Sequence, residues 1–209
     1  MTPPHGHHPI MLARHGQTAW SHDGRYQGQS DPPLSAAGML DAEALAASLR
    51  RVSLGVIVSS PLQRARQTAA ILVRMLGLTE AEIDPDLTEI SYGAWEGLTQ
   101  PVVKRYWPDL LRAWKRAPET VHFPGGEALS DMQSRIRRCL PIYTARAART
   151  PVLLITHSIW IRLALIESRV LPPSDFRRLP IPTGSLHALR TGFVHPCPQP
   201  KEQISCVSQ

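Results

Sequence analysis

Residues 151–158 read Pro-Val-Leu-Leu-Ile-Thr-His-Ser, and this stretch decides the fold. A short apolar run that ends in polar residues is typical of a strand buried on both faces of a parallel sheet. The same pattern occurs at residues 9–13 and 56–59, and residues 185–190 indicate a last strand. Strands that alternate with helices predict βαβ units. Helical patterns fill the intervals and are expected at about residues 35–51, 61–76, 127–148 and 157–170.

This alternation predicts the α/β class, as a three-layer α/β/α fold with a mostly parallel central sheet and helices on both faces. Local signals set the ends of two helices. Ser35 is a candidate N-cap, Pro61 suits the first turn of the next helix, and Gly77 suits its end.

We expect a single domain over residues 10–194, between a flexible N-terminus at 1–9 and a loose, Pro-rich tail at 195–209. The irregular stretch at about 90–126 is expected to be a small inserted lid over one end of the sheet. Two short helices are expected within this lid, near residues 100–106 and 108–116, with Trp107 and Trp114 as packing residues.

Composition limits the function classes. The 209 residues carry a formal net charge of +6, and only three of the 23 basic residues are lysines, which favours an anionic partner. No apolar run approaches the ~18 residues of a membrane span, and no leader pattern is present, so we expect a cytoplasmic protein without a membrane partner. We expect Cys139, Cys197 and Cys206 to form neither a disulfide framework nor a metal site. The histidines at 5, 7 and 8 are not expected to form a functional site.

Chemistry-bearing residues follow three of the predicted strands. Arg14 and His15 end the first strand, Arg64 comes shortly after the second, and His157 follows the strand quoted above. Ligands of open parallel sheets bind beyond the carboxyl ends of the strands, so these side chains are expected to converge. Guanidinium groups match phosphate oxygens, and a neutral imidazole can attack phosphorus. The pattern suggests phosphoryl transfer without a metal or another cofactor.

The chain also resembles the phosphoglycerate-mutase-like branch of the histidine phosphatase superfamily. The resemblance lies in an ordered set of blocks that spans about residues 10–190. These blocks are Leu12-Ala-Arg-His-Gly-Gln-Thr-Ala-Trp20, Arg25-Tyr-Gln-Gly28, Asp31-Pro-Pro-Leu-Ser35, Gly38, Ser59-Ser-Pro-Leu-Gln-Arg-Ala-Arg-Gln-Thr-Ala69, Leu87-Thr-Glu-Ile-Ser-Tyr-Gly-Ala-Trp-Glu-Gly97, Pro124-Gly-Gly-Glu127 and Thr156-His157.

The resemblance implies a role for each matching residue. His15 is implied as the nucleophile that becomes phosphohistidine, with Arg14, Arg64 and His157 forming the phosphate pocket. Glu89 is implied as the proton donor, and such a role requires a raised pKa. The implied substrate-binding residues are Gln17, Thr18, Ser21, Tyr26, Gln27, Gly28, Tyr92 and Ser158.

Three positions depart from the family pattern. Ser21 stands where the family usually has Asn, and Pro101 stands near a common Glu. Ser158 replaces a common Gly and would be strained if its backbone needed a positive φ. Arg162 is interpreted as a supporting residue. The cluster of Arg135, Arg137 and Arg138 is interpreted as a solvated helix face.

The favoured function is a metal-independent phosphomonoesterase that acts on a small phosphorylated metabolite. Alternatives are a phosphoglycerate-type phosphomutase and a divergent member that binds phosphorylated ligands or serves another reaction. Nucleic-acid binding is not expected, because no binding motif accompanies the arginines. The sequence leaves the oligomeric state open, a dimer included.

Overall fold

A computed structural model describes residues 8–189 of the chain. Its centre is a five-stranded sheet in the order β3-β2-β4-β1-β5. Three central strands run parallel, and β5 pairs antiparallel with β1 at one edge. At the other edge, β3 is a two-residue strand parallel to β2, which the sequence did not predict. The bounds are β1 Ile10–Arg14, β2 Val56–Ser59, β3 Glu82–Ile83, β4 Val152–Thr156 and β5 Leu186–Leu189.

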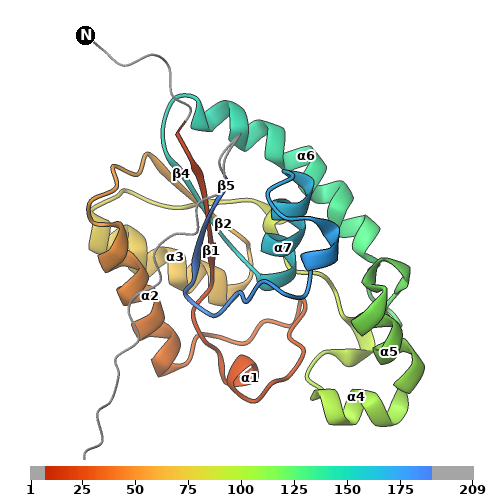
Figure 1. The fold of residues 1–209 in the computed structure, drawn as a ribbon. Helices are drawn as coiled ribbons and strands as arrows, with labels where there is room; N and C mark the ends of the chain where they lie inside the picture. The colour runs from red at the N-terminus through yellow and green to blue at the C-terminus, as the bar shows by residue number, and fades with distance from the viewer. Residues whose placement is uncertain (1–7, 190–209) are drawn as a thin grey trace, which may run out of the picture.

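Helices cover both faces of the sheet, which confirms the predicted three-layer α/β/α class. Figure 1 shows α2 (Ala36–Leu49) and α3 (Gln63–Leu76) on one face, and α6 (Leu129–Ala147) and α7 (Ser158–Glu167) on the other. Alternate residues of the strands pack into two separate hydrophobic cores. One core takes Met11, Ala13, Ile57, Leu153 and Ile155, and the other takes Ile10, Leu12, Val58, Val152 and Leu154.

The local signals for helix ends held at two of three positions. The Ser35 hydroxyl accepts the N–H of Gly38 and caps α2. Gly77 ends α3 with a φ of 69°. The prediction for Pro61 was wrong: α3 begins at Gln63, two residues later, because Leu62 takes the extended N-cap conformation.

Short helices and 3-10 turns make up the first part of the segment between strands β3 and β4, and they lie beyond one end of the sheet (Figure 1). Phe123 packs at the centre of an aromatic cluster, with ring centroids 4.9–5.1 Å from those of Tyr92, Trp95 and Trp114. Trp114 is buried there, as expected of a packing residue. The elements concerned are the helices α4 (Gln100–Tyr106) and α5 (Pro108–Arg116) and the 3-10 turns Pro85–Leu87, Gly93–Trp95 and Pro118–Thr120.

Two short elements complete the description: α1 (Ala19–His22) follows β1, and the 3-10 turn Pro173–Asp175 follows α7. Between residues 8 and 189, no helix has the length and apolar character needed to cross a membrane. The histidines at 5 and 7, two of the three cysteines and the tail at 195–209 lie outside the described residues.

Candidate active site

The strand register brings the two histidines together. Arg14 lies opposite Thr156 in the parallel β1–β4 pair, so the residues that follow them emerge side by side. The backbone N–H of His15 donates to the Thr156 carbonyl at 3.1 Å. The imidazole rings of His15 and His157 then lie 5.1 Å apart between centroids. Both rings are buried.

The His15 imidazole is held in one tautomer. Its Nδ1 lies 2.7 Å from the Gly16 carbonyl oxygen, which can only accept, so Nδ1 carries the proton. Its Nε2 accepts from Nε of Arg64 at 3.2 Å and therefore holds the lone pair. Burial, and next the positive charges of Arg64 and Arg14, hold the pKa of His15 well below its usual range. The ring is a neutral imidazole, and the Nε2 lone pair, which accepts from Arg64 here, is its nucleophilic electron pair.

Arg64 lies on the first turn of α3 and connects this histidine to a neighbouring loop. Its two terminal nitrogens donate to the carbonyls of Gly28 and Ser30, each at 2.7 Å. Burial lowers the pKa of Arg64 to about 10, so the side chain remains cationic at neutral pH.

Glu96 fixes the same loop from the other side. Its carboxylate accepts the N–H of Gln29 at 3.0 Å, and the N–H and hydroxyl of Ser30 at 2.7 and 2.6 Å. Gly28 has a φ of 54°, and a Cβ at this position would lie 2.1 Å from Oε1 of Glu96. Both facts explain why the loop requires glycine there.

Buried polar atoms at the site lack partners within the protein. Nε of Arg14 and Nδ1 of His157 are fully buried without a hydrogen bond, although Arg14 donates to the Ile181 carbonyl and His157 contacts Oγ of Ser60 at 2.8 Å. A buried polar group without a partner costs about 1–3 kcal/mol. Of these two residues, Arg14 lines the cavity that contains His15, and His157 does not.

Glu89 is the buried carboxyl group of the site. Oε1 accepts the N–H groups of Ile90 and Trp160 at 3.1 and 3.4 Å. Oε2 accepts the N–H of Ile159 at 3.2 Å and the Ser158 hydroxyl at 3.4 Å. Burial raises the pKa of Glu89, while these N–H groups and the nearby arginines act against that rise. The raised pKa suits a group that gives and takes a proton.

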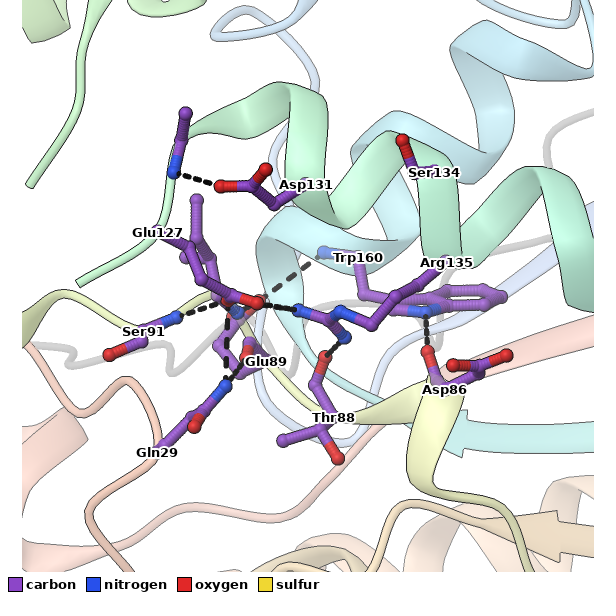
Figure 2. A network of polar contacts seen from close by, with 12 residues as sticks. Gln29, Asp86, Thr88, Glu89, Ser91, Glu127, Asp131, Ser134, Arg135 and Trp160 are labelled. Carbon is purple, nitrogen blue, oxygen red and sulfur yellow. Dashed lines mark hydrogen bonds and ion pairs between the residues drawn. The ribbon is translucent and has the colours of Figure 1, made fainter.

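A polar network holds the segment that carries Glu89 (Figure 2). Arg135 on α6 donates to the Thr88 carbonyl at 2.8 Å and pairs through one nitrogen with both carboxylate oxygens of Glu127. Glu127 in turn accepts the N–H of Ser91 at 2.8 Å. The residues on both sides of Glu89 are thus fixed by one ion pair. The prediction of a solvated face was wrong for Arg135, whose side chain is 14% exposed, since it reaches inward to this segment.

Most of the predicted substrate-binding residues line one cavity of about 110 Å³. Gln17, Thr18 and Ser21 are not among its lining residues. Thr18 and Ser21 form a reciprocal capping box at α1, and Gln17 accepts from the hydroxyl of Ser35. These three residues make hydrogen bonds within the protein here, and their expected contact with substrate stays a prediction. The lining residues are Arg14, His15, Arg25, Tyr26, Gln27, Gly28, Arg64, Glu89, Tyr92 and Ser158.

Ser158 is accommodated without backbone strain. It is the first residue of α7, and the only non-glycine residue with a positive φ in the described chain is Arg169. Pro101, another departure from the family pattern, lies in the first turn of α4, where a backbone N–H would have no helical partner. The sequence reasoning missed Ser60, Glu96 and Glu127 as supports, although all three stand inside the quoted motifs.

The arrangement suits a phosphate group. Arg14, Arg25, Arg64 and the neutral imidazole of His15 line the cavity, together with the protonatable carboxyl group of Glu89. The predicted pocket residue His157 does not line it, although its ring lies 5.1 Å from that of His15. No group of three or more His, Cys, Asp or Glu side chains suited to a metal ion occurs among residues 8–189. The donors that face a phosphate here are guanidinium groups, whose forked N–H groups match phosphate oxygens.

Comparisons with known proteins define the class. The model of the histidine phosphatase superfamily (branch 1) matches residues 10–193, and the chain belongs to this superfamily. Phosphoserine phosphatase 1 of Hydrogenobacter thermophilus is 35% identical over 73% of this chain and 72% of its own. A probable phosphoglycerate mutase of Yersinia enterocolitica is 32% identical over 85% and 82%.

A solved structure agrees with these relatives. The mycobacterial glucosyl-3-phosphoglycerate phosphatase in complex with VO3 has a TM-score of 0.78 and 30% identity, over 87% of this chain and 90% of that one. Within the superfamily, the chain is an enzyme of the phosphatase type.

Proposed function

We propose that the protein is a phosphomonoesterase that hydrolyses a small phosphorylated metabolite through a phosphohistidine at His15, without a metal ion, in the cytoplasm. The observation that carries the proposal is the tautomer of His15. Because Nδ1 is fixed on the Gly16 carbonyl, the lone pair of Nε2 lies on the side of the ring that faces Arg64.

In the first step, Nε2 of His15 attacks phosphorus and the bond from phosphorus to the ester oxygen breaks. Arg14 and Arg64 neutralise the phosphoryl oxygens, which is the main contribution that a protein makes to phosphoryl transfer. The proton of the Glu89 carboxyl group passes to the leaving oxygen, so that an alcohol departs. Burial supports this role, since it favours the protonated acid.

In the second step, water attacks the phosphohistidine. Glu89, now a carboxylate, takes one proton of the water as its oxygen bonds to phosphorus. The nitrogen–phosphorus bond breaks, and its electron pair returns to Nε2 of His15. The products are the alcohol and inorganic phosphate, and the neutral imidazole and the protonated Glu89 are restored.

The small cavity supports a metabolite as substrate, rather than a nucleic acid or another polymer, because its volume is only about 110 Å³. The mutase alternative keeps the first step but delivers the phosphoryl group to a second hydroxyl of the substrate. Its support is the mutase-named relative.

The test is hydrolysis of p-nitrophenyl phosphate with EDTA present, for the wild-type enzyme and the His15→Ala variant. We expect activity that resists EDTA and is lost in the variant, together with an acid-labile phosphoenzyme in the wild type alone. Activity that requires added metal, or that survives in the variant, contradicts the mechanism. Isomerisation of phosphoglycerates without release of phosphate would establish the mutase alternative, and the absence of any phosphoenzyme would leave a phospho-ligand binder.

A further inference from the structure

A second cavity adjoins the phosphate site and is also cationic. Its volume is about 180 Å³, and it shares Tyr26, Tyr92 and Ser158 with the cavity that contains His15. Its remaining lining residues are Trp114, Ile159, Arg162, Phe176 and Arg177. A ligand that extends beyond its phosphate past Ser158 would therefore enter a space with two arginines.

Arg162 and Arg177 come from different elements and lack an acidic partner. Arg162 lies on α7, and Arg177 follows the 3-10 turn Pro173–Asp175. Neither takes part in an ion pair within residues 8–189, whereas seven other arginines there do. Burial, and next the charge of Arg177, lower the pKa of Arg162. Two uncompensated like charges beside one cavity are stabilised when an anion binds between them.

The protein also fixes both guanidinium groups in place. One terminal nitrogen of Arg162 donates to the carbonyls of Phe176 and Leu179. Arg177 donates to the Trp114 carbonyl at 3.1 Å, and its guanidinium carbon lies 5.5 Å from the centroid of the Trp114 ring. These contacts use one terminal nitrogen of each side chain, so further N–H donors remain for a ligand. Preorganised donors of this kind suit a carboxylate or a phosphate.

We propose that this cavity binds a second anionic group of the substrate, so that the preferred substrates are phosphomonoesters whose alcohol part carries a carboxylate or a further phosphate. The proposal rests on the proposed phosphatase function and specifies its substrate class. Arg162 and Arg177 are the residues that determine this preference.

The experiment compares matched substrates. O-phosphoserine and O-phosphoethanolamine differ by one carboxylate, and 1,3-propanediol bisphosphate and 3-hydroxypropyl phosphate differ by one phosphate. We expect kcat/KM to be higher for the anionic member of at least one pair. The pair that shows the preference identifies the group. Equal kcat/KM values within both pairs would overturn the proposal.

The Arg177→Gln variant tests the residues, because Arg177 is exposed and glutamine removes its charge. The loss of a hydrogen bond to a charged group is expected to lower kcat/KM for the anionic member about tenfold, with little change for its partner. Arg178→Gln is the matched control, since it removes the same charge one residue away, outside the cavity, and it should leave the preference unchanged. An equal loss on both members, or the same effect in the control, would show a structural or general electrostatic role and refute the subsite.

Binding separates this proposal from the phosphatase function. In the inactive His15→Ala background, O-phosphoserine should raise the melting temperature more than O-phosphoethanolamine, and Arg177→Gln should abolish the difference. A wild-type enzyme that fails to hydrolyse p-nitrophenyl phosphate would overturn the phosphatase function, while this shift would still decide the subsite. If the two members of each matched pair raise the melting temperature equally, the subsite is refuted, whether or not the enzyme is an active phosphatase.

Discussion

Replacement of Glu89 by glutamine separates the two proton transfers of the proposed reaction. Glutamine keeps the shape of the side chain but cannot deliver a proton. Whichever way its amide turns, the NH2 group faces N–H donors that one carboxylate oxygen now accepts, for example that of Ile159 at 3.2 Å. A donor without an acceptor costs about 1–3 kcal/mol when buried. The amide is uncharged, like the protonated acid that burial favours at this position, so we expect the fold to persist.

The catalytic loss should depend on the leaving group. General acid catalysis contributes about 10²- to 10⁴-fold, equal to about 2.7–5.5 kcal/mol of transition-state stabilisation. An alkyl phosphate such as glycerol 3-phosphate needs the proton of Glu89, and its first step should slow by this amount in the variant. p-Nitrophenolate departs as a stable anion, so its first step should proceed at nearly the wild-type rate.

The second step distinguishes this mechanism further. Without the Glu89 carboxylate, the phosphohistidine loses its base and should accumulate. Rapid mixing of the variant with p-nitrophenyl phosphate should therefore give a burst of one p-nitrophenolate per enzyme, followed by slow turnover. The same loss on both substrates with no burst would refute the assignment of Glu89, as would full activity on the alkyl phosphate. Circular dichroism of the variant checks that the fold is retained.

Three further predictions concern the supports of the site. Arg135→Met should lower the free energy of unfolding in urea by about 1.5–3 kcal/mol, because hydrogen bonds between charged groups are lost in a mostly buried position. Arg138→Gln on the same helix, with a side chain 61% exposed, should lower it by under about 1 kcal/mol. Equal losses in the two variants would contradict the role of the network. Since the folded-state pKa of His15 is lowered, the folded protein resists protonation there, and stability should fall as the pH drops below the ordinary value of 6.5. The His15→Asn variant should reduce that slope by up to about 1.4 kcal/mol per pH unit, and an unchanged slope would show that the ring is not held neutral. Gly28→Ala should reduce activity and stability far more than Gly77→Ala. Both glycines have a positive φ, but only a Cβ at residue 28 would collide with a carboxylate, that of Glu96. Equal effects of the two substitutions in thermal melts and activity assays would argue against this contact.

The strands and the groups that follow them could be predicted from the sequence. Apolar runs locate β1, β2 and β4, and the parallel register then requires that Arg14, His15 and His157 converge at one edge. This part of the site follows from topology, since it does not depend on side-chain conformation.

The supporting contacts could not be predicted, because they depend on which partner a polar side chain reaches. Ser21 takes part in a helix cap, and Arg135 turns inward although its neighbours on α6 face solvent. A polar residue on a loop or helix has several partners in range, and only the packed structure selects one. The strand β3 was missed for a similar reason: its two exposed residues have no apolar run to mark them.

The position of β1 inside the sheet has a consequence for how the enzyme loses activity. This strand is hydrogen-bonded to β4 on one side and to β5 on the other, along nearly its whole length. Local opening starts at frayed edges and loops, and strands bonded on both sides exchange their amide hydrogens only when the whole domain opens. The nucleophile His15 thus directly follows the strand that we expect to unfold last. Heat should therefore displace His15 only when the whole domain melts.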